Sequence, residues 1–219
     1  MRYCFKFIFY LYVLYGFSFA NAGSYDDYFS AILKDDAPAV SALLARGFDP
    51  NTRNPAGDHG LLIALRVGST KVVPVLLAQA KLDVEARNRQ DESALMIASL
   101  KGMTETVQLL LNKDADVNKP GWTPLHYAAT GGHLQIMQLL LDNHAYIDAA
   151  SPNGSTPLMM AAMYGTPSAV KLLLEAGADP LLKNELGLTA IDFAQRASRK
   201  ESVDIIAAFV RARQPRGQW

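Results

Sequence analysis

The histidines and the cysteine are the side chains of this 219-residue chain most able to hold a metal ion. The histidines stand at His59, His126, His133 and His144, and no two of them have the one-turn spacing of a helical metal motif. The single cysteine, Cys4, has no second thiol with which to complete a metal site or a disulfide. We therefore predict that the chain binds no metal.

The serines and aspartates also lack the neighbours that catalysis requires. Ser93, Ser155 and Ser168 stand in capping or turn sequences, with no Gly-x-Ser-x-Gly elbow around them. Four aspartates recur in one phase and are interpreted as loop-organising residues: Asp49, Asp83, Asp116 and Asp179. No glycine-rich phosphate loop follows a strand pattern. The chain is therefore predicted to be no enzyme and to use no cofactor.

The charge balance narrows the class of partner. Lysine and arginine total 21, and aspartate and glutamate also total 21, so no basic excess is present to gather phosphates. This balance argues against nucleic acid as a partner. With 50% hydrophobic residues, the chain is long enough to bury a continuous core.

The first 22 residues have the pattern of a secretory signal peptide. Arg2 and Lys6 precede an apolar run over 7–19, and Ala20-Asn21-Ala22 supplies small residues before a cut. We predict cleavage after Ala22, with cleavage after Ala20 as the alternative. The apolar run is shorter than the roughly 20 residues of a membrane span, so no stable span is expected after cleavage. The predicted location is the bacterial periplasm, and secretion is the alternative.

A self-repeat explains the rest of the chain. The block Gly-Trp-Thr-Pro-Leu-His-Tyr-Ala from Gly121 recurs from Gly154 as Gly-Ser-Thr-Pro-Leu-Met-Met-Ala. Positions equivalent to its leucine are separated by 33, 34, 30, 33 and 33 residues, at Tyr28, Leu61, Leu95, Leu125, Leu158 and Ile191. This period is typical of a stack of small units. We predict six units, near 24–56, 57–90, 91–120, 121–153, 154–186 and 187–213, and a tail at 214–219.

Each repeat is predicted to form a helix, a turn, a second helix and a long loop. A Thr-Pro pair such as Thr123-Pro124 caps the first helix and fills its first turn, where no amide donor is needed. A small residue three positions after each mark allows close helix packing, at Ala31, Ala64, Ala98, Ala128, Ala161 and Ala194. Glycines are predicted to end the first helices in a tight left-handed turn, at Gly68, Gly102, Gly132 and Gly165. Asp114 and His144 take a left-handed position after the second helix, with some strain.

These residues resemble the ankyrin repeat. The resemblance is carried by the Gly121–Ala128 block, the leucine run at 139–141 and Gly177-Ala178-Asp179. It implies an all-α ankyrin-repeat solenoid of about six helix-turn-helix units with projecting loops. It also implies that His126 forms hydrogen bonds between repeats. Ankyrin arrays bind diverse partner proteins, so the resemblance predicts protein binding without naming the partner.

The resemblance places partner contacts on the projecting loops and on the ends of the first helices, which line a concave groove. The candidate contacts are Arg66, Arg89, Leu100, Lys101, Lys119, Trp122, Met163 and Tyr164. An acidic protein surface with a protruding hydrophobic element would suit them. Two alternatives stay open: Trp122 covers its own neighbours, and Leu33 and Leu100 pack inside.

One interval departs from the period. Asn118 to Gly121 is three steps, whereas Asp148 to Gly154 and Glu85 to Asp91 are six, so the loop before the fourth repeat is shortened. Trp122 follows directly, which makes this interruption the preferred place to look for function.

The function predicted from the sequence is a non-catalytic protein–protein interaction scaffold in the periplasm or outside the cell, monomeric, with a partner of unknown identity. The alternative is an inhibitor or immunity protein that blocks one specific toxic enzyme. It differs in requiring a single tight partner.

Overall fold

The computed structural model describes residues 23–213, and the predicted signal peptide and tail lie outside this range. Apart from an isolated bridge between Arg53 and His59, the regular structure of these residues is helical. The chain divides into two compact units, up to Asp83 and from Val84 onward. The predicted all-α class is confirmed.

The first compact unit holds two helix pairs. A helix over residues 23–33 is followed by α2 (Ala37–Ala45), α3 (Gly60–Val67) and α4 (Val72–Leu77). The Asp35 carboxylate accepts hydrogen bonds at 3.0 Å from the backbone N–H groups of Lys71 and Val72. The turn of the first repeat thus satisfies amides at the start of α4, where a helix lacks internal partners.

Tyr28 fills the core of this unit. Its side chain is buried, and its hydroxyl donates to the Pro50 carbonyl oxygen at 3.3 Å. A Cβ on Gly60 would lie only 2.4 Å from the Tyr28 hydroxyl oxygen, so α3 must begin with glycine to reach this ring. The absence of a Thr-Pro pair in the second repeat therefore has a packing reason.

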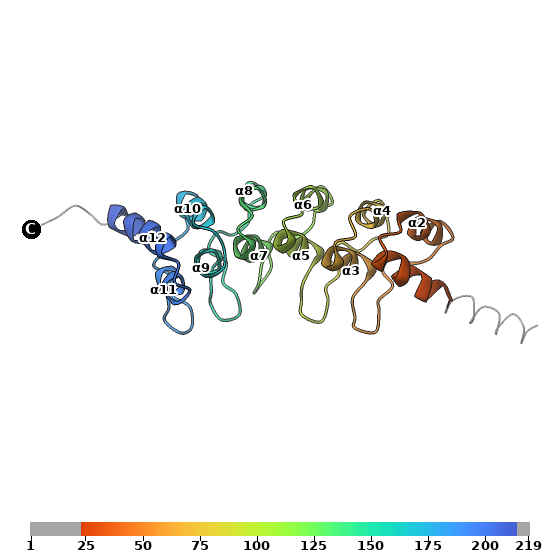
Figure 1. The fold of residues 1–219 in the computed structure, drawn as a ribbon, viewed down its shortest axis with the longest axis horizontal. Coiled ribbons are helices and arrows are strands. Elements are labelled where there is room, and N and C mark those ends of the chain that lie inside the picture. The colour runs from red at the N-terminus through yellow and green to blue at the C-terminus, as the bar shows by residue number, and fades with distance from the viewer. Residues whose placement is uncertain (1–22, 214–219) are drawn as a thin grey trace, which may run out of the picture. The chain divides into compact units, whose positions relative to one another are not determined.

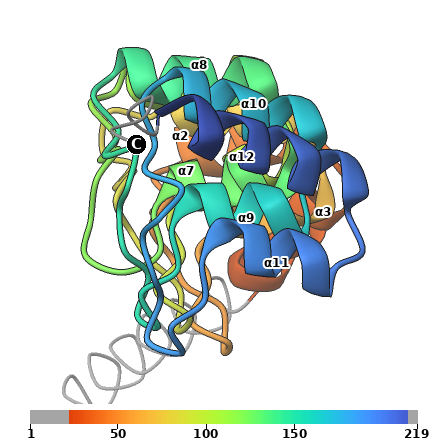
Figure 2. The ribbon, with the colours of Figure 1, turned by 90° about the vertical axis from the view of Figure 1, so that its left-hand side faces the viewer.

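The second compact unit arranges its helices in two rows (Figures 1 and 2). The inner row comprises α5 (Ala94–Lys101), α7 (Pro124–Gly131), α9 (Pro157–Met163) and α11 (Ala190–Arg196). The outer row comprises α6 (Thr104–Leu111), α8 (Leu134–Asp142), α10 (Pro167–Glu175) and α12 (Lys200–Arg213). Each inner helix packs on the next one and on the outer helix of its own repeat.

The predicted periodic residues form the core. Leu125 and Leu158 are fully buried. The alanines three positions after each mark are buried in all six repeats, which allows inner helices to approach closely. On the outer helices Leu110, Leu140 and Leu173 are fully buried, and Leu174 of α10 is buried as well, while Leu109 is exposed.

The turn predictions are confirmed at most positions. Gly68, Gly102 and Gly132 have positive φ values of 81°, 73° and 69°, and Asp114 and His144 take the left-handed position with φ of 58° and 65°.

Gly165 is the exception, and the prediction of a left-handed turn there is wrong. It has no positive φ, and Tyr164 before it is right-handed. A Cβ on Gly165 would stand 2.4 Å from the backbone oxygen of Ala129 on α7. Glycine is needed here because two backbones meet, and not because of its own φ.

Candidate protein-binding surface

His126 is a structural residue, as the resemblance implied. Its Nδ1 accepts from the Thr123 backbone N–H at 3.2 Å, so Nε2 carries the proton and donates to the Ser155 carbonyl oxygen at 2.9 Å. This bond joins the fourth repeat to the fifth. Burial lowers the pKa of His126 to about 4, so the imidazole is neutral at physiological pH.

Side-chain hydrogen bonds between successive repeats show which residues of the long loops are equivalent. Asn118 donates through Nδ2 to the His144 carbonyl oxygen and accepts from the Tyr146 N–H, both at 2.8 Å. Asp148 accepts from the Asp179 N–H one repeat later, at 3.2 Å. Asn118 and Asp148 are therefore equivalent, and the missing residues lie between Asn118 and Gly121.

The loop before α7 is visibly shorter than those before α5 and α9 (Figure 1). The loop before α9 ends in a tight turn, with Ser151 N–H donating to the Ser155 oxygen at 2.9 Å and Gly154 N–H to the Ser151 oxygen at 2.8 Å. Asn88 and Asn184 pair in the same way with Glu92 and Leu188. Within the described residues, Asn118 to Trp122 form no such turn.

A charged cluster braces the short loop. The Lys119 ammonium contacts the Asp91 carboxylate, and Arg87 approaches the same carboxylate at 3.3 Å. The hydrogen bond from Lys119 holds the pKa of Asp91 below its usual value. Asp91 is itself left-handed, with φ of 62°, where most long loops carry glycine.

The inner-helix ends carry the exposed candidates. Leu100 is 38% exposed and Tyr164 52% exposed, Lys101 is exposed and Met163 is half-buried. The alternative in which Leu33 and Leu100 pack inside is wrong, since Leu33 is 61% exposed.

Two side chains hold the backbone of these ends. His133 Nε2 lies 3.0 Å from the Leu100 carbonyl oxygen, and the Arg199 guanidinium donates to the oxygens of Tyr164 and Gly165. Leu100 and Tyr164 thus project from fixed backbone.

Seven of the eight predicted contacts belong to the second compact unit, and Arg66 belongs to the first. Arg66 donates to the buried Asp58 carboxylate at 2.7 Å, so its guanidinium has an internal partner. Arg89 is exposed on the loop before α5. Trp122 is half-buried and meets His126 edge-on at 5.2 Å between ring centroids. Whether each of these residues touches a partner stays a prediction.

The exposed apolar residues that were not predicted include the two most exposed ones among the described residues. Tyr146, which follows α8, is 68% exposed, and Leu186, at the tip of the loop before α11, is 76% exposed. A large apolar residue at a loop position between a helix end and a turn glycine is the signal that would have found them.

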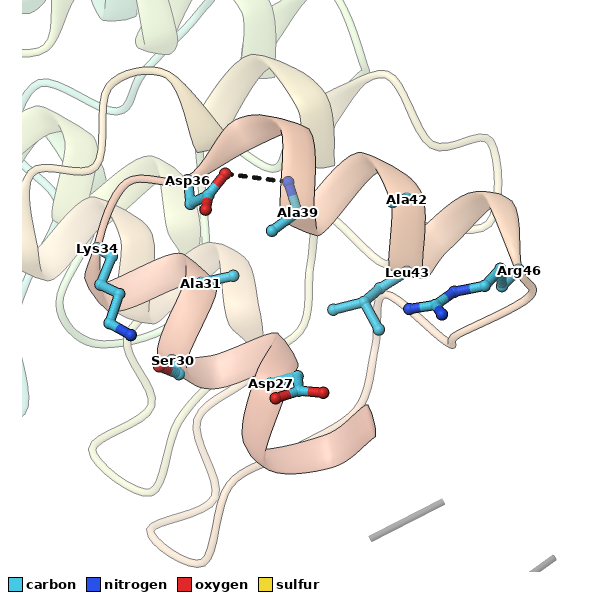
Figure 3. Close-up of a pocket in the computed structure, with 9 residues that line it drawn as sticks. All are labelled: Asp27, Ser30, Ala31, Lys34, Asp36, Ala39, Ala42, Leu43 and Arg46. Carbon is cyan, nitrogen blue, oxygen red and sulfur yellow. Dashed lines mark hydrogen bonds between the residues drawn. The ribbon is translucent and has the colours of Figure 1, made fainter. Parts of the chain in front are cut away.

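The first compact unit has a hollow of about 300 Å³ between the helix over residues 23–33 and α2 (Figure 3). Alanine and leucine side chains form its apolar part, and its charged residues are Asp27, Lys34, Asp36 and Arg46. Asp36 already accepts from the Ala39 N–H at 3.0 Å as the cap of α2. Acidic and basic groups balance here, so the hollow selects no ligand charge.

Two kinds of site were not found in the part of the chain that the structure describes. Within residues 23–213, no three histidine, cysteine or acidic side chains gather in a way that could hold a metal ion. Over the same residues, no helix combines the length and apolarity needed to cross a bilayer.

Paired helices, projecting loops and inter-repeat hydrogen bonds define a helical solenoid of the protein-binding class. The family model for ankyrin repeats in three copies matches residues 29–120, 61–152, 118–184 and 144–213. The chain belongs to the ankyrin repeat family, which is generally non-catalytic and acts in protein–protein interaction.

Comparisons with individual proteins agree with the family. The human transient receptor potential cation channel subfamily A member 1 is 32% identical over 70% of this chain and 15% of its own length. The mouse B-cell lymphoma 3 protein homolog is 33% identical over 66% of this chain and 34% of its own length. The chain thus spans 15% and 34% of the length of these two relatives.

A solved structure is similar over nearly its whole length. It comes from the complex of the predatory endopeptidase Bd0816 of Bdellovibrio bacteriovorus with the immunity protein Bd3460. The match has a TM-score of 0.72 and 28% identity, and covers 83% of this chain and 97% of that one.

Proposed function

We propose that this protein is an exported, non-catalytic, monomeric binding module that works in the bacterial periplasm or outside the cell. The observation that carries the proposal is the set of inner-helix ends in the second compact unit. There the exposed Leu100, Lys101 and Tyr164 flank Gly131, which has no side chain. Apolar side chains beside one cation suit an acidic protein surface with a protruding apolar element.

The assignment to an exported compartment is supported by the charged, apolar and small-residue segments of residues 1–22. Fractionation of the native host, followed by mass measurement of the recovered chain, tests it. A mature protein that begins at Gly23 or Asn21 agrees with export. A full-length chain in the cytoplasm contradicts it.

The absence of catalysis is supported by the structural use of the polar side chains near this surface. His126 forms hydrogen bonds with Thr123 and Ser155, and His133 forms one with the Leu100 carbonyl oxygen. Turnover by the purified protein that is lost on changing one of its exposed polar residues would contradict this part of the proposal.

Affinity capture from the exported fraction tests binding. The wild type is compared with a Trp122→Ala, Tyr164→Ala double variant and with Leu109→Ala as a control that removes an exposed apolar side chain from the outer helix α6. We expect the double variant alone to lose its captured protein. Equal recovery by all three chains contradicts the site, and no recovery by the wild type contradicts the binding function.

A second candidate function is that of an inhibitor or immunity protein that blocks one enzyme. The observation that favours it is the likeness to the solved endopeptidase–immunity protein complex. It predicts one partner in one-to-one ratio, whereas a scaffold binds several proteins.

Titration of this protein into an exported endopeptidase of its own host, with release of labelled substrate as the readout, separates the two candidates. Complete inhibition at equimolar protein supports the immunity function. Binding of several proteins without any loss of enzyme activity supports the scaffold.

A further inference from the structure

One polar side chain in each of the first four repeats connects its repeat to the backbone of the next. These side chains stand at one position of the repeat, and we call them the junction residues: Asn51, Glu85, Asn118 and Asp148. Each accepts a hydrogen bond from a backbone N–H of the following repeat. The series ends at the fifth repeat, where the same position holds Leu181, whose side chain has no polar atom.

The two asparagines among the junction residues form two kinds of bond. Asn51 donates through Nδ2 to the Lys81 carbonyl oxygen at 2.7 Å and accepts from the Asp83 N–H at 2.8 Å. Asn118 forms the same pair of bonds, one donated and one accepted, between the third and fourth repeats, both at 2.8 Å. An amide side chain can form both because it carries a donor and an acceptor.

Asp148 connects the fourth and fifth repeats less completely. Its two carboxylate oxygens share the Asp179 N–H, each at 3.2 Å. The carbonyl oxygen that corresponds to the one bonded by Asn118 belongs to Gly177, and among the described residues this oxygen accepts no hydrogen bond. An ionised carboxylate has no donor to offer it. The fourth and fifth repeats therefore lack the donated bond of the asparagine junctions.

The surroundings of Asp148 favour a protonated carboxyl. The charged groups that face it are the Asp179 carboxylate of the next repeat and the Arg213 guanidinium at the end of α12. Burial and the Asp179 carboxylate raise the pKa of the half-buried Asp148, although the Asp179 N–H and Arg213 act in the opposite direction. The other acidic junction residue, Glu85, instead has the Arg87 guanidinium 3.7 Å from its carboxylate.

From these contacts we propose that the junction between the fourth and fifth repeats is a pH-sensitive contact that is strengthened by acid. A proton taken from solvent by Asp148 makes one carboxyl oxygen a donor to the Gly177 carbonyl oxygen. The other oxygen keeps the bond from the Asp179 N–H. The protonated side chain then forms the two bonds that Asn118 forms one repeat earlier, and loss of the proton at neutral pH removes the donated bond.

The direction of the effect follows from the raised pKa of Asp148. The folded chain binds this proton more tightly than the unfolded chain, so the contribution to stability is present in acid and is lost as the pH rises through the folded-state value. His126 connects the same two repeats through Ser155, and its lowered pKa gives the opposite dependence. Only a comparison in which His126 is unchanged isolates Asp148.

Asp148→Asn tests the proposal, because it supplies the donor at every pH and leaves His126 in place. We expect this variant to melt about 2 °C above the wild type at pH 7 in scanning calorimetry. The difference should shrink as the pH is lowered toward 4, where the wild type gains its own donor. Amide hydrogen exchange at pH 7 locates the effect, since the Asp179 N–H should exchange more slowly in the variant.

The matched control is the reverse change one repeat earlier, Asn118→Asp. It places a carboxylate where Asn118 donates to the His144 carbonyl oxygen. We expect it to melt below the wild type at pH 7. Titration of the carboxyl carbons by NMR measures the Asp148 pKa directly in the folded wild type, and this pKa should lie above that of an exposed aspartate.

Three outcomes overturn the proposal. A melting temperature of Asp148→Asn at or below that of wild type at pH 7 shows that the added donor does not strengthen the junction. An increase that is the same at every pH shows that Asp148 gains no bond when it is protonated. Asp148→Leu copies Leu181 and removes the charge without adding a donor. If it stabilises the chain as much as Asp148→Asn, loss of the charge and not the donated bond is the cause.

Discussion

The fourth and fifth repeats begin with almost the same sequence and differ at both ends of their inner helices. The fifth repeat has a complete loop, closed by backbone hydrogen bonds between Ser151 and Ser155, and ends its inner helix against the backbone of α7. The fourth has a truncated loop, braced by Lys119, and ends in a left-handed glycine, Gly132. The same motif therefore follows a complete loop in one repeat and a truncated loop in the other, and the repeat with the truncated loop carries part of the candidate binding surface.

The two turn glycines give the largest expected difference. Gly165→Ala places a Cβ 2.4 Å from the Ala129 backbone oxygen, which cannot move without shifting α7. We expect a loss of about 3 kcal/mol in the free energy of unfolding, the upper part of the range for overpacking.

The matched variant is Gly132→Ala, whose Cβ would lie 2.7 Å from the Thr166 methyl carbon and 3.2 Å from the Thr166 backbone nitrogen, at a left-handed φ of 69°. Its loss should be about 1 to 2 kcal/mol. Urea unfolding of both variants decides the order. A larger loss for Gly132→Ala would show that a left-handed backbone opposes alanine more strongly than the close backbone contact at Gly165 does.

The residue three positions after the capping threonine gives the next difference. It is His126 in the fourth repeat and Met159 in the fifth. Burial lowers the pKa of His126 from 6.5 to about 4, so the unfolded chain binds a proton in this interval and the folded chain does not. Stability should therefore fall as the pH drops from 6.5 toward 4.

Between pH 7 and pH 5 this linkage corresponds to about 2 kcal/mol. His126→Met copies the fifth repeat and should flatten the dependence, even if its stability at pH 7 is lower because the bond to Ser155 is lost. Denaturant titrations at both pH values give the free energy of unfolding of each chain, and the difference between the two values shows how strongly it depends on pH. Parallel curves for wild type and variant would show that His126 has the same pKa in the folded and the unfolded chain.

The left-handed position after the outer helix gives a smaller difference. His144 in the fourth repeat has φ of 65°, where the fifth has Gly177. His144→Gly should raise the free energy of unfolding by about 0.5 to 1 kcal/mol, because relief of strain exceeds the entropy that glycine loses on folding. Scanning calorimetry should record an increase of about 2 °C in the melting temperature.

The reverse change in the fifth repeat, Gly177→Ala, is the control. Its Cβ would meet no atom within 4 Å, so only the positive φ opposes it. It should lower the melting temperature. If both variants lower it, the His144 side chain makes a contribution that its backbone angle does not account for.

The sequence predicted the features of the fold in which one residue type determines the local geometry. The Thr-Pro-Leu blocks and the left-handed His144 act through their own backbone or their near neighbours, and the periodic alanines recur at one position of every repeat, so spacing located them. Gly165 and Gly60 were not explained, because their requirement for glycine comes from a backbone or a tyrosine ring in another repeat.

The candidate site was predicted less completely for the same reason. The shortened loop was counted correctly, but the pairing of Arg66 with Asp58 and of Lys119 with Asp91 depends on how side chains meet in space. These pairs removed Arg66 and Lys119 from the set of unpaired charges.

The bracing of the short loop gives the smallest expected effect. Lys119→Met keeps the aliphatic stem, which is buried because the Lys119 side chain is only 6% exposed, and removes the ammonium that contacts Asp91, whose side chain is 61% exposed and open to solvent. Because solvent screens the pair, the loss in the free energy of unfolding should be about 0.5 kcal/mol at low salt. The same variant should equal wild type in stability at about 1 M salt, where the Debye length is near 3 Å.

Ser151→Ala removes a side chain from the complete loop and leaves its backbone turn, so its effect should not change with salt. A Lys119→Met loss that persists at high salt would mean that packing of the lysine stem, and not its charge, holds the short loop beside Asp91.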